Sequence, residues 1–451
     1  MTAMTKSFHL TFVFLTFSSF LLRAETKSLE EWWKGKGAAG DLFGVRPTLE
    51  DRGLKFSGHW ASVYAGVVAG GLQHRGTFVE QLKFDLEVDF AKVTGWEPLE
   101  GLTFSAGVRW RDGVLINPFV GTTSLLSPVT FRSGHGWRVF PFYLTYTTPE
   151  FLGKKDLLTL SGGWQNPYEI FAQQPEAKFF RNNGINANQG IAANDLVWSS
   201  SYATWGGYLK VKPTKWYYAM AGLYMAIPDG SATANHGLDF EGSPGNNGLW
   251  FIGETGVTPE LGSAKLPGKY VFGGYYWGLE NESFNGATYP GRFGFYWQAA
   301  QMLWREPSPP SVEEKSGDAK SFKATAAAPK PKLSDQGLRW FSWFHYAPSY
   351  NGLRPFYFYT GLIYKGLIPT RDQDQLGVAF AYGNFSQFNQ ANQEANNRPV
   401  QTYEAGLECG YRIQLNKWAF VQPFIEYIIR PGGAGIVDNA TVLGMYFRVN
   451  F

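Results

Sequence analysis

Apolar and polar residues alternate along this chain with a period of two, in blocks of about ten residues that recur from one end to the other. The clearest block is residues 81–90. One face of it carries Leu82, Phe84, Leu86, Val88 and Phe90, and the other carries Gln81, Lys83, Asp85, Glu87 and Asp89. Because successive side chains of a β-strand point to opposite faces, each block predicts a strand with one apolar and one polar face.

The same alternation predicts about sixteen strands. Their approximate ranges are 56–70, 80–91, 101–112, 139–149, 156–165, 202–211, 216–227, 247–257, 268–278, 291–304, 337–347, 355–366, 375–385, 401–413, 418–430 and 440–451. An even number of antiparallel strands brings both chain ends to the same side of the sheet. We therefore expect an all-β protein, a transmembrane antiparallel β-barrel.

A membrane barrel accounts for the pattern better than a soluble sandwich does. The polar faces carry charges of both signs, which suits a water-filled lumen, and the chain ends on an alternating strand at Phe451. Aromatic residues make up 17% of the chain and there are 53 Gly, yet the mean hydropathy is −0.23. Aromatic girdles outside and small or polar residues inside are typical of such barrels. Beyond the N-terminus, no segment approaches the roughly 20 apolar residues of a membrane helix.

Residues 1–24 are typical of a secretory signal peptide. Lys6 precedes an apolar run at 10–22, and Arg23 and Ala24 follow it. This run is too short to span a bilayer as a helix. We expect cleavage after Ala24 and insertion of the mature chain in the outer membrane of a Gram-negative-type bacterium. The alternative is a buried N-terminal helix.

The links between the predicted strands differ in length in the way that a membrane barrel requires. The long links, expected to be extracellular, are 113–138, 166–201, 228–246 and 386–400; the short ones, expected to be periplasmic, are 150–155, 212–215 and 414–417.

Two further segments are expected on the periplasmic side. Residues 25–54 precede the barrel domain, 55–451, and contain a short helix beginning at Leu29 and a turn near Pro47. Residues 306–334 are rich in Pro, Ala, Lys and Ser and predict a disordered periplasmic insertion.

Several function classes find no support in the residues. The net charge is +3 and two of the positive charges lie in the signal region, so nothing favours a nucleic-acid partner. Cys409 is the single cysteine, which excludes an intrachain disulfide, a thiolate metal cluster and a CxxC redox pair. No zinc-protease, nucleophile-elbow or phosphate-loop motif occurs. We expect no metal, no cofactor and no enzymatic activity.

Six short pieces, in order, resemble the carbohydrate-selective porins of the OprB type. They are 40–53 (beginning GDLFGVRP), 266–270 (LPGKY), 298–307 (QAAQMLWREP), 335–338 (DQGL), 361–374 (GLIYKGLIPTRDQD) and 427–433 (YIIRPGG). The family usually has Trp-Gly where this chain has Leu42-Phe43, so packing there can differ. The resemblance covers most of the mature chain and implies a sixteen-stranded barrel that passes monosaccharides and similar small polar solutes. Residues 306–334 lie between two matched pieces and resemble an addition to the family pattern.

A pore for neutral sugars needs hydrogen-bond donors and acceptors rather than charge of one sign. The neighbouring strands 80–91 and 101–112 provide both on their polar faces. The residues expected to line the pore are Lys83, Asp85, Glu87, Asp89, Arg109 and Arg111, with Glu404, Glu408 and Arg412 as weaker candidates on the opposite part of the wall. Among them, Arg109, Arg111, Asp85 and Glu87 are the expected constriction. The competing interpretation is a ladder of ion pairs that only stiffens the wall.

Other residues and partners follow from the same topology. Trp164, Trp205 and Trp304 could stack on sugar rings, although alternation places Trp164 outward; a girdle position suits most Trp residues. Cys409 is expected to face lipid. The expected partners are small sugars, outer-membrane lipid and lipopolysaccharide. A monomer and a homotrimer both remain open, since a lipid-facing wall and a subunit contact have the same composition.

Three alternatives in function also remain open. A general or anion-preferring diffusion porin has the same architecture, and glucose block of single channels separates it from a sugar-selective pore. A barrel enzyme would need a catalytic constellation at the rim, whereas the six His occur singly. A soluble lectin would be extracted without detergent.

Deletion of residues 308–332 should leave membrane insertion, conductance and sugar block unchanged, because such a composition cannot sustain a packed core. Added protease should cleave this segment in permeabilised cells but not in intact ones. Cleavage in intact cells would place it outside and would overturn the assigned topology.

Overall fold

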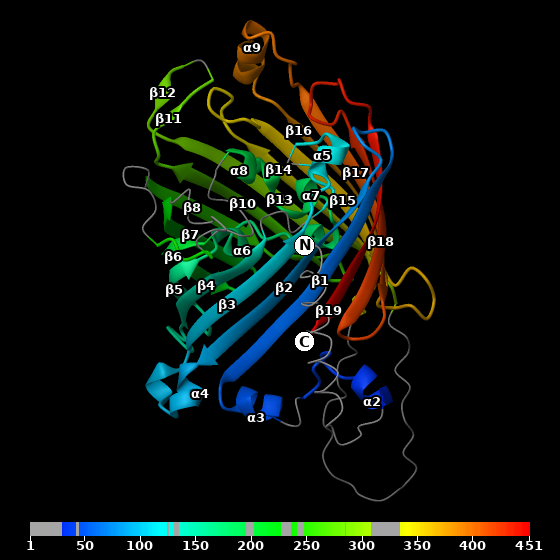
Figure 1. The fold of residues 1–451 in the computed structure, drawn as a ribbon. Helices are drawn as coiled ribbons and strands as arrows, with labels where there is room; N and C mark the ends of the chain where they lie inside the picture. Colours follow the sequence, from blue (N-terminus) through cyan, green and yellow to red (C-terminus); the bar gives the residue numbers. More distant parts are fainter. Residues whose placement is uncertain are drawn as a thin grey trace, which may run out of the picture.

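The computed structural model describes residues 29–41, 45–123, 126–129, 135–194, 203–226, 236–240, 248–284, 286–307 and 334–451. Within them the chain forms a closed antiparallel barrel (Figure 1). Its sixteen wall strands are β1 (Leu54–Ala69), β2 (Gly76–Asp89), β3 (Leu102–Gly113), β4 (Gly136–Thr147), β5 (Leu158–Gln165), β6 (Thr204–Thr214), β7 (Tyr217–Ala226), β8 (Gly248–Val257), β10 (Leu266–Trp277), β13 (Arg292–Arg305), β14 (Gly337–Tyr346), β15 (Phe356–Lys365), β16 (Gln375–Asn384), β17 (Tyr403–Gln414), β18 (Ala419–Ile429) and β19 (Ala440–Asn450). Each wall strand pairs with the next along the chain, and β1 pairs with β19 to close the ring.

The sequence prediction of strand number and position is confirmed. Every predicted range overlaps one wall strand, with ends that differ by a few residues. The predicted neighbours 80–91 and 101–112 pair as β2 and β3, with Lys83 opposite Arg109. A closed ring has no free strand edge, so every strand has a hydrogen-bonding partner on both sides, as a lipid environment demands.

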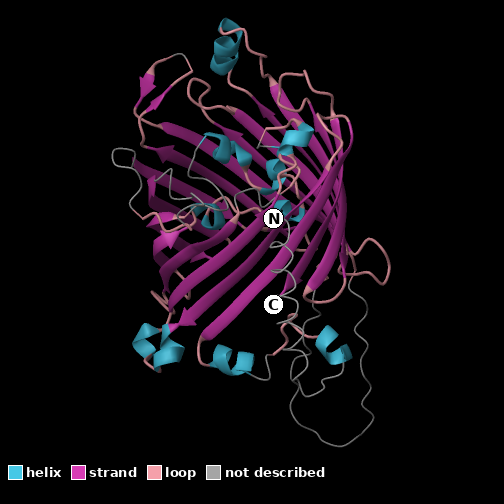
Figure 2. Cartoon of the chain, in the orientation of Figure 1, coloured by secondary structure: helices cyan, strands magenta, loops and turns pink. Residues whose placement is uncertain are grey.

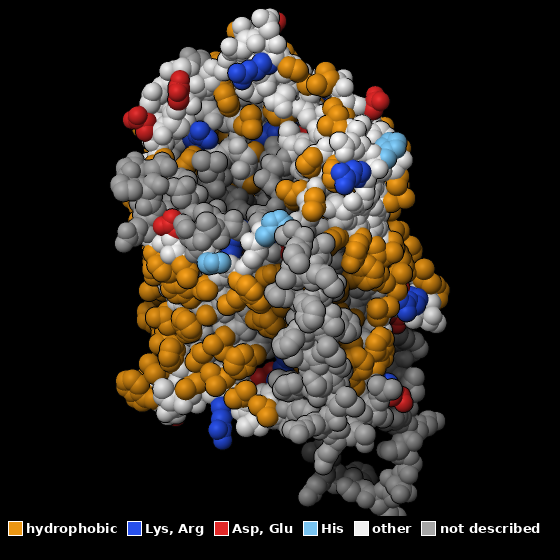
Figure 3. All heavy atoms as spheres, in the orientation of Figure 1, with side chains coloured by type: hydrophobic (Ala, Val, Ile, Leu, Met, Phe, Trp, Pro, Cys, Tyr) orange, Lys and Arg blue, Asp and Glu red, His pale blue; other side chains and the backbone are white. Residues whose placement is uncertain are grey.

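The outward faces of the wall strands are apolar. Large side chains such as Phe84, Leu160 and Leu362 are exposed there, and apolar side chains form a broad band across the face of the barrel seen in Figure 3. Exposed tryptophans lie near both ends of this band, with Trp216 at a periplasmic turn and Trp137 near the opposite rim. This arrangement is that of an outer wall in lipid with an aromatic girdle at each interface.

Short elements flank the wall at both ends (Figure 2). At the periplasmic end lie α2 (Leu29–Trp33), α3 (Val45–Asp51), α4 (Phe90–Thr94), η1 (Glu97–Leu99) and β9 (Glu260–Leu261). At the extracellular end lie α9 (Gln387–Ala395) and the hairpin of β11 (Asn281–Glu282) and β12 (Thr288–Tyr289). No helix of the described segments is long and apolar enough to cross a membrane.

Two of the long links leave the extracellular rim and fold into the lumen instead of standing outside it. One contains α5 (Asn117–Val120); the other contains α6 (Pro167–Ile170), η3 (Glu176–Phe179), α7 (Asn183–Asn186) and α8 (Gln189–Asn194). Residues 166–194 of the second link, named here the inner loop, are largely buried. The alternation pattern carried no sign of this inward path, because these residues are irregular.

The inner loop packs against an aromatic part of the inner wall. Phe171, Phe180 and Ile185 of the loop are buried with Trp250 and Trp343 of the wall in one apolar cluster. The close approach requires small residues on the strands. A Cβ on Gly377 of β16 would lie 2.4 Å from Cε1 of Phe179, so glycine lets this ring approach the strand. The loop therefore stays inside a wet barrel by sharing an apolar core with the wall.

The N-terminal segment lies against the barrel near its closing seam. The rings of Trp32 and Trp33 lie 4.9 Å and 5.5 Å from that of Trp418, between β17 and β18. The amide of Ala38 donates to the carbonyl of Asn450 at 2.9 Å. Both predicted short elements, near Leu29 and Pro47, are present as α2 and α3. Residues 1–28, including the predicted signal peptide, and 308–333, most of the predicted insertion, lie outside the described residues.

These contacts predict that residues 25–50 brace the periplasmic end of the barrel. Removing them should expose Trp418 and lower the temperature at which the folded band converts to the unfolded band on gels. Trp418→Ala should have an effect in the same direction, on the order of 3 kcal/mol for loss of a buried Trp. Trp216→Ala, at an exposed periplasmic position, is the matched control. Equal conversion temperatures for all variants would contradict the brace.

Candidate functional site: the constriction of the barrel

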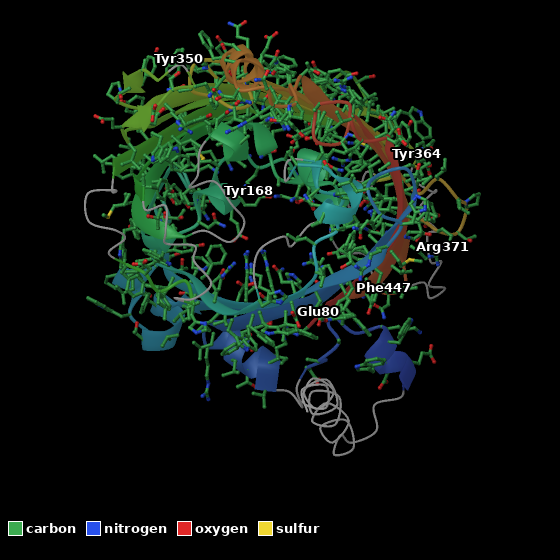
Figure 4. The ribbon with its side chains drawn as sticks, turned by 45° about the horizontal axis from the view of Figure 1, so that its top comes forward. Glu80, Tyr168, Tyr350, Tyr364, Arg371 and Phe447 are labelled. Carbon is green, nitrogen blue, oxygen red and sulfur yellow. The ribbon has the colours of Figure 1, made fainter. Side chains whose placement is uncertain are left out.

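The inner loop touches the wall at three widely separated strands. Glu169 of α6 forms an ion pair with Arg109 of β3. The backbone of the loop donates to Glu254 of β8 and to Glu408 of β17, which are six strands apart around the ring. The loop therefore crosses the lumen and narrows it. Figure 4 shows Tyr168, which also belongs to α6, inside the ring of strands.

Glu254 and Glu408 hold the loop because buried backbone donors need acceptors. One Glu254 oxygen accepts from the amide of Ala172 at 2.8 Å and the hydroxyl of Tyr296 at 2.7 Å. Glu408 accepts from the amides of Arg181 and Asn182 at 2.7 Å and 2.8 Å. Each of these buried carboxylates accepts hydrogen bonds from backbone amides of the loop, so the two groups fix its path.

A local capping motif orients Glu169. The side chain of Asn166 caps α6 by accepting from the amide of Tyr168 at 3.0 Å, and Pro167 occupies the first turn, where its missing N–H costs nothing. This single helical turn presents Glu169 to the β3 wall, where the carboxylate meets the Arg109 guanidinium.

The wall opposite α6 carries a row of cations across three strands. Lys83 of β2 lies directly opposite Arg109 of β3, and Arg109 lies opposite Arg138 of β4. Like charges at directly opposed positions destabilise a sheet. Two carboxylates offset this charge: Glu169 pairs with Arg109, and Asp85 lies 3.1 Å from Lys83. The nearby Arg111 donates to Gln81 at 2.8 Å.

A polar cavity of about 260 Å³ opens between α6 and strands β1 to β4. It is lined by Lys55, Ser57, Lys83, Asp85, Leu86, Glu87, Ser105, Ala106, Pro141, Tyr143 and Glu169. The lining contains two lysine ammonium groups and three carboxylates. It also contains the hydroxyl groups of two Ser and one Tyr. Such a lining offers many donors and acceptors with little net charge.

The structure brings together only part of the predicted pore set. Lys83, Asp85 and Glu87 line the cavity, and Arg109 adjoins it through Glu169. Asp89 lies at the periplasmic end of β2, where its side chain accepts from the amide of Lys92 and caps α4. Whether any of these side chains contacts a solute stays a prediction.

The three weaker candidates face inward but are covered by loops. Glu404 is fully buried and accepts from the amide of Thr123 at 3.0 Å and the guanidinium of Arg354 at 2.8 Å, which ties down the link that contains α5. Glu408 holds the inner loop as described. The guanidinium of Arg412 lies between the rings of Phe179 and Phe420, at 4.8 Å and 4.3 Å from their centroids.

Sequence reasoning missed Glu169, Glu254, Arg138 and Tyr143. Glu169 lies on an irregular loop that has no apolar–polar alternation. In 139–149, which contains Tyr143, the run of aromatic residues leaves it ambiguous which residues face inward. The one available signal for Glu169 is the Asn166-Pro167 pair, which is typical of a helix start.

The tryptophan candidates lie away from the cavity. Trp164 and Trp205 cluster with Phe142 and Phe240, and Trp304 is exposed beside Tyr364. Alternation places Trp164 on the same face of β5 as the exposed Leu160, but Trp164 itself is fully buried in this aromatic cluster. Within the described residues, no group of three or more His, Cys, Asp or Glu is placed to hold a metal ion.

Known proteins resemble this chain over nearly its full length. It is 24% identical to Porin B of Pseudomonas aeruginosa, over 92% of this chain and 91% of that protein. It is 21% identical to the putative porin QuiX of Acinetobacter baylyi, over 91% and 92%. The high-pH structure of Pseudomonas putida OprB superposes with a TM-score of 0.78 at 22% identity, over 93% of this chain and 99% of the other, which shows the same fold.

The family profile gives the identity. The OprB family of carbohydrate-selective porins matches residues 74–451, which include strands β2 to β19 and the inner loop. The protein is therefore a member of the OprB family of carbohydrate-selective porins, a sugar-diffusion channel of the bacterial outer membrane.

Proposed function

We propose that sugars are selected in the cavity between α6 and the wall of β1 to β4, by passive diffusion and without catalysis. The observation that carries this proposal is the row of Lys83, Arg109 and Arg138 facing the carboxylate of Glu169. Fixed charges of both signs bind hydroxyl groups as donors and acceptors while their fields largely cancel. A neutral polyol can then exchange its hydrogen bonds to water, one after another, for hydrogen bonds to the wall.

The same charges explain weak rather than tight binding. A hydrogen bond to a charged group contributes about 1.5–3 kcal/mol, but a hydroxyl that enters the cavity leaves water that bonds it almost as well. The wall groups are also held in place, Arg109 by Glu169 and Lys83 by Asp85, so little ordering accompanies entry. A solute that binds weakly at a fixed site leaves as readily as it enters, as a channel requires.

We further propose that lipid and lipopolysaccharide contact the apolar outer wall, and that the buried carboxylates of the lumen are structural. Glu254, Glu404 and Glu408 have their oxygens occupied by loop amides and neighbouring side chains. This occupancy leaves them unsuited to proton transfer.

The oligomeric state is open between a monomer and a homotrimer. Sedimentation of the protein in detergent, with the mass of the bound detergent subtracted, separates the two.

Replacing Arg109 and Arg111 together with Ala should raise small-ion conductance and weaken glucose block, because side-chain volume and hydroxyl-binding donors are lost from the inner wall. One lost hydrogen bond of about 1 kcal/mol corresponds to roughly fivefold weaker block. Single-channel recording with a glucose series measures both. Arg398→Ala, exposed beyond α9, removes the same kind of charge outside the lumen and is the control. Undiminished glucose block in the double variant would contradict the proposed selection site.

Glu169→Gln and Arg109→Gln should shift ion selectivity in opposite directions. The first removes a negative charge from the constriction and should favour anions, and the second should favour cations. Reversal potentials in a KCl gradient measure the ratio of anion to cation permeability. At high ionic strength both shifts should shrink, since the Debye length falls from about 10 Å at 0.1 M to 3 Å at 1 M. Shifts of the same sign would show that the pair does not line the path of the ions.

Liposome swelling with equally sized sugars and amino acids tests the function as a whole. A sugar-selective pore passes the sugars faster. Equal rates for both classes would favour the general diffusion porin, which the sequence left open.

A further inference from the structure

A second cavity, of about 350 Å³, lies along β6, β7, β8 and β10, near the periplasmic end of the barrel. It is lined by Ile170, Gln173, Lys210, Lys212, Lys215, Tyr217, Tyr218, Met220, Glu254, Thr258 and Lys269. These residues come from α6 and the inner loop, from the turn between β6 and β7, and from the periplasmic ends of β8 and β10. The single turn α6 thus contributes Glu169 to the first cavity and Ile170 to this one.

The lining of this second cavity is strongly unbalanced in charge. The lining contains four lysines and a single carboxylate, that of Glu254. Both oxygens of Glu254 are already engaged, one by the hydroxyl of Tyr218 at 2.9 Å and the other by Ala172 and Tyr296. The first cavity, by contrast, has three carboxylates for two lysines.

The lysines themselves use neutral partners. The ammonium of Lys269 donates to the carbonyl of Gln173 at 2.8 Å, and that of Lys210 lies 4.9 Å from the centroid of the Tyr218 ring. Among the residues that the structure describes, no carboxylate forms an ion pair with Lys210, Lys212, Lys215 or Lys269. A concave wall that carries several ammonium groups attracts anions, because a cleft lined by charge of one sign concentrates its field.

The neutral groups of the lining add specificity for hydroxylated solutes. Thr258, Gln173 and Tyr217 offer hydroxyl and amide groups, and Tyr218 offers a ring face. Lysine is a compact point charge that accepts a carboxylate or a phosphate in many geometries. Lys212 and Lys215 are exposed at the rim of the cavity, whereas Lys210 and Lys269 are half-buried. Lys210 shares an inner-wall row with Met220 and Glu254.

We propose that this cavity is a binding subsite for small hydroxylated anions, that is, sugars carrying an acidic group, at the periplasmic exit of the pore. The inference deepens the proposed function and rests on it, since the solute must first pass the constriction. The two cavities then have different roles. Balanced charge at the constriction admits hydroxylated solutes, and excess positive charge below it retains those that are acidic.

The test compares block of single channels by gluconate, glucose 6-phosphate and glucose, each added from the periplasmic side. Gluconate and glucose 6-phosphate distinguish a carboxylate from a phosphate as the preferred group. In the triple variant Lys210→Gln, Lys212→Gln and Lys269→Gln, block by the preferred anion should weaken about tenfold, which corresponds to about 1.4 kcal/mol in total. Glucose block should not change.

The matched control replaces Lys155, Lys265 and Lys417, exposed on periplasmic turns outside the cavity, with Gln. It alters the net charge equally and should leave anion block as in the wild type. If the control loses as much anion block as the cavity variant, the effect comes from overall charge and the subsite is refuted. Undiminished anion block in the cavity variant would also refute it.

A second readout does not require conduction. Saturation-transfer NMR of gluconate with the detergent-solubilised protein should show contact that the cavity variant loses and the control keeps. Absence of glucose block in the wild type, with gluconate contact intact, would refute the proposed sugar selection but not the subsite. Absence of gluconate contact together with normal glucose block would refute the subsite alone.

Discussion

Closure of the sheet is the constraint on which the rest of this structure depends. In lipid a backbone amide without a partner costs several kcal/mol, so a sheet can cross the membrane only if its first strand meets its last. Here β1 pairs with β19 along ten registered residue pairs from His59 to Ala69, and the ring has no free edge. The apolar outward face and the enclosed inward face both follow from this ring. The N-terminal segment binds close to the same seam, at Trp418 and Asn450.

An enclosed lumen then raises a second problem, which is how a long loop can remain inside it. Buried carboxylates on the wall provide the solution. Glu254 and Glu408 accept amide hydrogens from the inner loop, and Glu404 does the same for the link that contains α5. An aromatic part of the inner wall, with Trp250 and Trp343, gives the loop an apolar surface to pack on. The charged wall of β1 to β4 is left facing the polar cavity between it and α6.

The proposed function depends on a contrast within one inner surface. One part is aromatic and holds the loop; another carries Lys83, Arg109 and Arg138 in a row that a sheet alone would disfavour. The row persists because Glu169 and Asp85 pair with it. A row of like charges is unfavourable in a sheet on its own, and the proposed contact of these donors with a solute gives a functional reason for it.

The sequence by itself determined the number of strands, their order, which face of each strand points inward, and the class of protein. Alternation with a period of two is a local property of the chain, and a barrel in lipid requires its apolar faces to point outward. It also placed Lys83, Asp85, Arg109 and Arg111 on the inner face of neighbouring strands. Only the tertiary structure decided which inward residues are accessible. Glu404 and Glu408 have the same alternation as Asp85, yet loops cover them, and Glu169 enters the constriction from a segment without any period. The physical reason is that alternation fixes which side of the wall a residue faces, whereas the path of a loop depends on contacts between residues far apart in the chain.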